Sequence, residues 1–317
     1  MKSFVNFVYK SKKLKTNFLL VFIFLILLPS RNYYSSLDLS NGNPVVRSSP
    51  HQFISISDYP VNHTNIQAPY LSARSIIIID QNSKTILYQK NPDLISSPAS
   101  ITKVMTALVV LDNYQLDQVV TINSLNSIGQ IMELEIGEQI TVENLLYGLL
   151  VQSGNDAAYT LANLHQDGQK GFIKAMNNKA KELKLHNTQF QNPTGLDSYG
   201  HYSTTHDIAI LGAIAMENKI FKKMVNTKTI TITDVNNTVI HKLETINDLL
   251  GKVSGLKGIK TGWTELAGEC LVTYTKRGNK EIITVILGSQ DRFGESAQLI
   301  DWTFNNHQWL KVSPTIH

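Results

Sequence analysis

Segments with a β-strand pattern stand on both sides of a long helical stretch, and this order constrains the fold more than any other feature of the sequence. Near the front, "SIIIID" at 75–80 and "TILYQK" at 85–90 flank the polar turn "QNSK", which predicts a hairpin. Strand patterns return toward the C-terminus, at 229–233, 239–243, 258–264, 269–275 and 281–288. The order of strand hairpin, helices, strands and closing helix favours an α+β fold with one sheet assembled from both ends of the domain.

The middle of the chain has helical patterns. Residues 141–165 predict two helices interrupted at "QSGN", because Ser-Gly-Asn is turn chemistry between two apolar periodic runs. Residues 171–185 place their apolar side chains on one helical face, and "TTHD" at 204–207 begins a further helix with a capping pattern. A last helix is expected over 295–310.

The composition excludes some classes of function. With 42% hydrophobic and 17% charged residues, the 317-residue chain has a globular balance and can bury a large core. The formal net charge is +4, but five lysines in the first 16 residues contribute +5, so the remainder carries −1. The body of the protein therefore gives no electrostatic support for a nucleic-acid partner. Cys270, the only cysteine, excludes an internal disulfide and is expected in the core rather than as a nucleophile.

The N-terminus has the pattern of an export signal. The basic start runs into "FLLVFIFLILL" at 18–28, which is shorter than the roughly 18–20 residues of a spanning helix. No A-x-A-like site follows, so residues 1–30 are expected to be either a cleaved signal peptide or a retained membrane anchor. Residues 31–70, rich in Ser, Asn and Pro, are expected to form a flexible linker, with one catalytic domain over 71–312.

One pair of residues suggests nucleophilic catalysis. In "SSPASITKVMTALVVLD" at 96–112, Ser100 stands three positions before Lys103 at the expected start of a helix. Residues at i and i+3 lie on one face with Cβ atoms about 5–6 Å apart, so the amine can reach the hydroxyl. A serine hydroxyl needs a base, and a lysine can serve when burial or a second cation lowers its pKa.

The S-x-x-K pair alone is a common pattern. A second copy, "SGLK" at 254–257, stands in a glycine-rich turn where the geometry would be wrong. Two further elements raise the significance of the first copy: "SGN" at 153–155 between two helices, and "KTG" at 260–262 in a strand. The combination of order, spacing and structural setting favours chemistry.

With these motifs the sequence resembles a known family, the low-molecular-mass penicillin-binding proteins or serine D-alanyl-D-alanine carboxypeptidases of peptidase family S11. The resemblance covers roughly residues 71–310 and includes "NPTGLDSYGHYSTTHDIA", "GIKTGWTELAGECLV" and "ILGSQDRF". It implies the fold of serine β-lactamases and penicillin-binding transpeptidases: an antiparallel sheet flanked by helices plus a mainly helical subdomain. It also implies export to the periplasm or to the extracytoplasmic face of the membrane.

The resemblance assigns roles to nine residues. Ser100 would be the acylated nucleophile and Lys103 its base, while Ser153 and Asn155 would relay protons and hold the substrate amide. Lys260 would keep Lys103 neutral and, with Thr261, bind the terminal carboxylate. Gly262 would let the peptide lie against the strand, the backbone N–H groups of Ser100 and Trp263 would form the oxyanion hole, and Arg292 would bind a carboxylate.

The implied reaction is acyl transfer on a peptidoglycan stem peptide. Ser100 attacks the D-Ala–D-Ala bond, D-alanine leaves and water hydrolyses the acyl-enzyme, while β-lactams inhibit by acylating the same serine. No cofactor and no metal are expected: the nine histidines form no H-E-x-x-H, and His201 and His206 are interpreted as loop and cap residues.

Departures from the family pattern leave alternatives open. The chain stops soon after the closing helix, so no C-terminal β-domain is expected, an architecture shared with the related endopeptidases that cut cross-links. "SGN" favours a carboxypeptidase over an endopeptidase. The stretch 123–138 lacks the family's fuller Gly/Ser-rich pattern, so the deacylation rate stays open. A serine β-lactamase is disfavoured by the absence of an E-x-x-x-N pattern between "SGN" and "KTG", and a non-catalytic wall-binding protein by the intact nucleophile and base.

Overall fold

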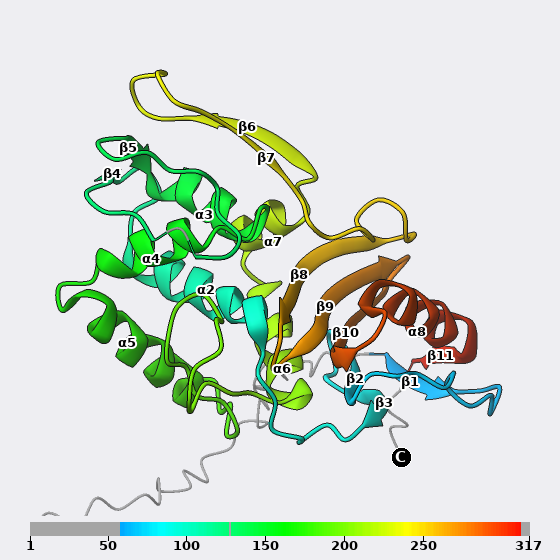
Figure 1. Cartoon of the computed structure of the whole chain (residues 1–317). Helices are drawn as coiled ribbons and strands as arrows, with labels where there is room; N and C mark the ends of the chain where they lie inside the picture. The colour runs from blue at the N-terminus through cyan, green and yellow to red at the C-terminus, as the bar shows by residue number, and fades with distance from the viewer. Residues whose placement is uncertain (1–57, 127, 312–317) are drawn as a thin grey trace, which may run out of the picture. The chain divides into compact units, whose positions relative to one another are not determined.

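A five-stranded antiparallel sheet joins the two ends of the domain, as the sequence predicts (Figure 1). The computed structural model describes residues 58–311 except residue 127. The sheet has the order β3-β2-β10-β9-β8. Its strands are β2 (Ser75–Asp80), β3 (Ile86–Lys90), β8 (Leu256–Thr264), β9 (Gly268–Arg277) and β10 (Lys280–Ser289). Because β10 lies between β2 and β9, the sheet requires both the early hairpin and the late strands.

Burial on both faces of the sheet explains why the sequence of strand β2 is apolar without alternation. All six of its residues are buried, since the sheet is covered on both faces. Ile77 and Ile79 belong to the larger apolar cluster, and Ile76 and Ile78 to a second cluster on the other face. The strand therefore lacks a solvent-facing side.

Helices cover both faces of the sheet. The helices of the described residues are α2 (Lys103–Asn113), α3 (Val142–Leu150), α4 (Asn155–Asn163), α5 (Gly168–Glu182), α6 (Thr205–Ala215), α7 (Lys219–Val225) and α8 (Arg292–Asn306), preceded by the 3₁₀ turn η1 (Ala99–Thr102). Helix α6 packs on the face of the larger cluster, where a Cβ on Gly212 would lie 3.3 Å from both Ile259 and Val272. Helix α8 covers the other face with Leu299 and Ile300.

A helical lobe stands beside the sheet at the β8 end (Figure 1). It contains α2 to α5 and the small pair β4 (Val119–Thr121) and β5 (Gln139–Thr141). A second hairpin, β6 (Thr229–Thr233) and β7 (Ile240–Glu244), extends toward this lobe. Asn144 of α3 donates to the Thr233 carbonyl at 2.9 Å, which fixes the hairpin to the lobe.

Two predictions near the chain ends are wrong for one reason. The sequence predicts that residues 307–310 continue the last helix and that residues 31–70 form a linker, of which the structure describes 58–70. The structure places strand β11 (His307–Leu310) antiparallel to strand β1 (Tyr59–Asn62), so the two mispredicted segments pair with each other. Trp309 anchors the pair by donating from Nε1 to Asp80 at 2.8 Å. The folded domain thus includes β1, well before the predicted boundary at residue 71.

The predicted signal or anchor over 1–30 lies outside the described residues, as does the linker up to residue 57. Within residues 58–311, no helix is long and apolar enough to cross a membrane.

Candidate active site

Ser100 lies in the turn η1, whose backbone packs closely against two glycines, Gly195 and Gly262. Ala99, just before it, has φ +49°, a conformation that L-residues rarely adopt. A Cβ on Gly195 would stand 1.8 Å from the Ala99 carbonyl oxygen, and one on Gly262 would stand 3.0 Å from the Ser100 nitrogen. Glycine at these two positions lets the loop at 195 and strand β8 press against the turn that carries the serine.

Lys103 contacts the serine directly and is fully buried. Its Nζ lies 2.9 Å from Ser100 Oγ and 2.9 Å from the Thr194 carbonyl, to which it donates. Burial lowers the pKa of Lys103 well below its ordinary value, and repulsion from Lys260 lowers it further, against an opposing effect of Asp156. A neutral amine beside a hydroxyl is the arrangement that general-base activation of a serine requires.

Ser153 and Asn155 lie at the turn between α3 and α4, where the sequence predicts an interruption. Ser153 has φ +66° and is buried, yet its Oγ contacts no hydrogen-bonding atom of the described residues. The Asn155 side chain donates to the Ile128 carbonyl at 2.7 Å, while its Oδ1 is likewise unpaired in this part of the chain. Buried polar groups are normally paired, so these two oxygens suit a ligand.

Lys260 and Thr261 extend the site along strand β8. Burial, and secondly the charge of Arg292, lower the pKa of Lys260 to about 7. Its Nζ donates to the Thr261 carbonyl at 3.1 Å, and the Thr261 hydroxyl is buried without a partner among residues 58–311 as described. Neither Lys103 nor Lys260 forms an ion pair with any described carboxylate.

The remaining predicted residues lie on the same strand and on α8. Arg292 begins α8 and donates from Nη1 to the Gly262 carbonyl at 3.3 Å, with Glu269 Oε1 at 3.8 Å. Trp263 is 60% exposed at the cleft wall. At Gly262 the space that a Cβ would take is occupied by Ala99 and Ser100 of the chain itself, and the predicted role of this glycine toward the peptide stays a prediction.

A cleft of about 600 Å³ brings these residues together. Seven of the nine predicted residues line it: Ser100, Ser153, Asn155, Thr261, Gly262, Trp263 and Arg292. Lys103 and Lys260 are buried next to lining residues. Three unpaired hydroxyl or amide oxygens, two cationic groups and the serine therefore converge on one cleft that can accept a peptide with a terminal carboxylate.

Sequence reasoning gave no role to a residue that joins three walls of the cleft. Asp197 Oδ1 accepts hydrogen bonds from Ser97 at 3.0 Å and from Thr264 at 2.8 Å, and Oδ2 accepts from the Leu266 nitrogen at 3.2 Å. The residue stands in "NPTGLDSYG", a turn-rich stretch whose only signal was its resemblance to the family. Its contacts fix the loop at 195, the segment before Ser100 and the end of β8 relative to one another.

Other candidates from the sequence lie elsewhere. Ser254 of the second S-x-x-K is outside the cleft and its carbonyl accepts from Arg277. Burial raises the pKa of Cys270 to about 11 and lowers that of His201 to about 4, so the thiol is inert and the imidazole neutral. His201 contacts Thr102 at 2.8 Å. In the described part of the chain no three His, Cys, Asp or Glu residues are grouped to hold a metal ion.

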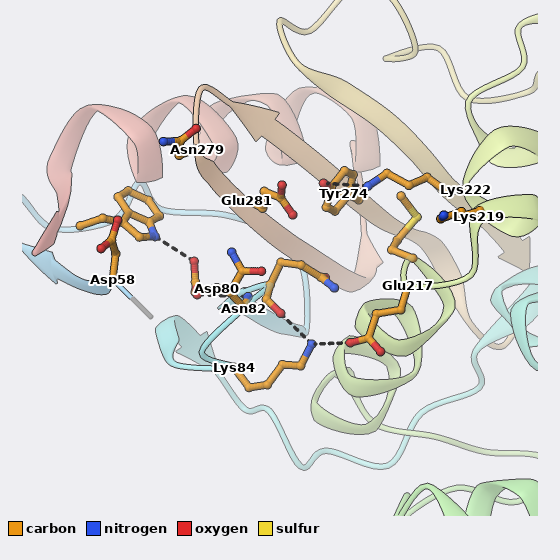
Figure 2. Close-up of a pocket in the computed structure, with 13 residues that line it drawn as sticks. Asp58, Asp80, Asn82, Lys84, Glu217, Lys219, Lys222, Tyr274, Asn279 and Glu281 are labelled. Carbon is orange, nitrogen blue, oxygen red and sulfur yellow. Dashed lines mark hydrogen bonds and ion pairs between the residues drawn. The ribbon is translucent and has the colours of Figure 1, made fainter. Parts of the chain in front are cut away.

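A larger cavity of about 900 Å³ lies at the opposite end of the sheet (Figure 2). It is lined from β2, β9, β10, β11, α7 and neighbouring turns, and contains none of the predicted site residues. Two of its three lysines are engaged, since Lys84 lies 3.5 Å from Glu217 and donates to the Gln81 carbonyl, and Lys222 donates to the Tyr274 hydroxyl at 3.3 Å, while Lys219 is exposed. Its lining residues include no serine, threonine or cysteine, and none of its lysines is buried.

Comparison with known proteins gives consistent matches. The family model for D-alanyl-D-alanine carboxypeptidases, peptidase family S11, matches residues 62–291. D-alanyl-D-alanine carboxypeptidase DacF of Bacillus subtilis is 35% identical over 247 residues, covering 74% of this chain and 63% of that protein. The D-alanyl-D-alanine endopeptidase of Escherichia coli is 32% identical, covering 75% of this chain and 79% of that protein. This chain therefore spans less than two thirds of the first relative.

The fold has a solved counterpart. The crystal structure of the Streptomyces K15 DD-transpeptidase superposes with a TM-score of 0.71 at 34% identity, covering 76% of this chain and all of that one. The α+β fold with its antiparallel sheet and helical lobe, predicted from the sequence, is confirmed.

Proposed function

Because the chain belongs to the D-alanyl-D-alanine carboxypeptidase family, peptidase family S11, we propose that it hydrolyses the terminal D-Ala–D-Ala bond of peptidoglycan stem peptides through an acyl-enzyme on Ser100. One observation carries the proposal: the Ser100 hydroxyl lies 2.9 Å from the amine of Lys103, which is buried beside a second lysine and has no carboxylate partner in the described chain. Burial and like charge keep that amine neutral and basic.

The reaction follows from these positions. Lys103 takes the Ser100 proton as Oγ attacks the carbonyl carbon, and the backbone N–H groups of Ser100 and Trp263 stabilise the oxyanion. The C–N bond then breaks, the proton passes to the leaving amine by way of Lys103 and Ser153, and D-alanine departs. Water, deprotonated by the same amine, hydrolyses the ester.

The cleft gives the substrate its orientation. Lys260, Thr261 and Arg292 offer two cations and an unpaired hydroxyl to the terminal carboxylate. The free Asn155 Oδ1 accepts from a substrate amide, which fixes the peptide opposite Ser100. β-Lactams carry a carboxylate and a reactive amide in similar positions, so they acylate the same serine.

The site of action that we propose is the extracytoplasmic face of the cell membrane, where the wall peptide is found. The basic and apolar start of the chain supports export, as a cleaved signal or a retained anchor. Fractionation of cells producing the full chain, followed by N-terminal sequencing of the recovered protein, distinguishes the two forms; recovery from the cytoplasm alone would contradict the proposal.

The test uses the full-length protein with two substrates, a stem pentapeptide ending in D-Ala-D-Ala and a cross-linked dimer, followed by mass spectrometry. Loss of one alanine from the monomer supports the carboxypeptidase, and cleavage of the dimer alone identifies an endopeptidase, an activity named for relatives of similar identity. Penicillin should add covalently to Ser100 and not to a Ser100→Ala variant. Rapid turnover of a cephalosporin would instead indicate a β-lactamase.

A further inference from the structure

A buried pair of ionisable side chains lies outside the catalytic residues but next to the active site. His241 of strand β7 contacts Glu138 with Nε2 2.7 Å from Oε1, and the two side chains are 3% and 0% exposed. The other ring nitrogen, Nδ1, lies 3.1 Å from the Met132 carbonyl oxygen. The reaction proposed above uses neither residue.

These contacts require a proton that an isolated neutral histidine lacks. A carbonyl oxygen only accepts, so Nδ1 must carry the hydrogen that faces Met132. A second hydrogen must then lie between Nε2 and Oε1, because two lone pairs would otherwise face each other at 2.7 Å. Hydrogen bonding to Glu138 accordingly raises the pKa of His241, with burial opposing.

The segment that this pair holds is the active-site loop, residues 128–138. Ile128, Gly129 and Gln130 line the catalytic cleft. At Met132 the backbone is held from two sides, since its N–H donates to Asp156 at 3.0 Å while its carbonyl faces His241. Glu138 also accepts from the Glu135 nitrogen at 3.0 Å, so the pair fixes the far end of the loop.

The near end of the loop is joined to a catalytic residue. Asn155 donates from its backbone to the Gln130 carbonyl and from its side chain to the Ile128 carbonyl, both at 2.7 Å. The direction of the Asn155 amide, and with it the free Oδ1, therefore depends on where the loop lies. The β6–β7 hairpin is fixed to the helical lobe (Figure 1), so His241 holds the loop from a firm support.

We propose that His241 and Glu138 form a clasp, closed by a shared proton, that positions the active-site loop from strand β7 and so sets the rate at which Ser100 is acylated. His241 is a positioning residue and touches no substrate. Other charged groups near its ring are Asp156 on α4, which favours the protonated form, Glu133 and Glu135 on the loop, and Lys242 on β7. Of all the charged groups around the His241 ring, only Glu138 contacts it.

The test compares three forms of the full-length protein. Glu138→Gln keeps the clasp without the shared proton, because the Gln amide donates to a neutral Nε2 while Nδ1–H still faces Met132. Glu138→Gln combined with His241→Phe removes the clasp without leaving a buried charge. His206→Phe, which changes a half-exposed histidine on α6, is the matched control.

Acylation by a fluorescent penicillin is resolved into its binding constant and its acylation rate constant. We expect the single Gln variant and the control to acylate within about twofold of wild type, and the double variant to lose about tenfold in the acylation rate constant with little change in binding. Hydrogen exchange in 128–138 should accelerate in the double variant only. A second double variant, Glu138→Gln with His241→Gln, restores one hydrogen-bond donor at position 241 and should recover part of the acylation rate constant. It takes the place of the first double variant in the comparison if the first does not fold.

Two results would overturn the proposal: a double variant, folded, that acylates as fast as Glu138→Gln, or ¹⁵N and ¹³C spectra of wild type at neutral pH in which His241 Nε2 and the Glu138 carboxylate both lack a proton. Failure of penicillin to label wild type would count against the proposed reaction instead, while the exchange and ¹⁵N measurements would still test the clasp.

Discussion

Lysines stand both beside the candidate cleft and in the larger cavity at the opposite end of the sheet, but only those beside the cleft are buried. In the larger cavity Lys84 has Glu217 and Lys222 has the Tyr274 hydroxyl (Figure 2). In the cleft, Lys103 and Lys260 are buried and the described chain gives neither a carboxylate. An ion pair at the surface stabilises the fold slightly. Burial of a lysine away from any carboxylate instead lowers the pKa of its amine and makes the amine a base.

This comparison shows that the volume of a cavity does not indicate where the reactive groups of the protein lie. The lysines of the cavity of about 900 Å³ are partly or fully exposed, whereas the cleft of about 600 Å³ adjoins two buried lysines and is lined by three buried oxygens that have no partner among the described residues. Four substitutions test this contrast, from the largest expected effect to the smallest.

Lys103→Met should reduce penicillin acylation of Ser100 by about 10³-fold, because the serine loses its base. Labelling with a fluorescent penicillin measures the loss, and circular dichroism checks the fold. Lys84→Met in the larger cavity is the matched lysine control, expected to label like wild type. Comparable loss in both variants would remove the contrast.

Lys260→Met should lower kcat/KM for the pentapeptide by about 10²-fold and make the fold more stable at pH 7 by about 1–3 kcal/mol. The folded pKa of Lys260 is about 7, below its unfolded value of about 10.4, so burial costs wild type the most at and below pH 7. That cost disappears as pH rises above the unfolded pKa. Urea unfolding at pH 7 and pH 10 should therefore show a stability gap that narrows with pH; a constant gap would contradict the shifted pKa.

Gly262→Ala should slow acylation by about tenfold and destabilise the fold by about 1–2 kcal/mol, because the new methyl would stand 2.9 Å from Ala99 Cβ and 3.0 Å from the Ser100 nitrogen. Thermal unfolding and penicillin labelling measure the two effects. Gly278→Ala, at a turn with φ +61° and no atom near the new Cβ, is a comparison that adds backbone strain without crowding, and it should leave acylation unchanged. Wild-type rates in Gly262→Ala would show that η1 does not depend on close packing against β8.

Glu217→Gln in the larger cavity should change stability by less than about 0.5 kcal/mol and leave acylation unchanged, since its ion pair with Lys84 is largely exposed. A loss of peptide hydrolysis in this variant, with penicillin labelling intact, would assign the larger cavity a part in substrate binding.

Local patterns predicted much of this molecule. The unbroken apolar run of β2, the turn at Ser153 and the spacing of Ser100 and Lys103 are all written in neighbouring residues, and the structure places them as expected. The predicted roles of the site residues remain predictions, but the structure brings all nine to one cleft or directly beside it.

Long-range side-chain contacts could not be predicted in this way. Strand β11 has a helix-compatible sequence and is extended only because β1 pairs with it. Asp197 and His241 act through partners far along the chain, Thr264 and Glu138, and no spacing rule connects such residues. The sequence "VIHKL" around His241 does not indicate that the ring of this histidine is buried against the Glu138 carboxylate.

The place of β10 between β2 and β9 also dictates an order of events during synthesis. A growing chain that has reached residue 250 already contains Ser100 and Lys103, yet it has neither Lys260 nor β10, which pairs with one side of β2. Pairing across such sequence distance is slow, and until it happens the apolar "SIIIID" segment has no partner on the β10 side. The nascent chain therefore lacks part of the candidate site while an apolar strand is still unpaired on one side, and an unpaired apolar strand favours aggregation.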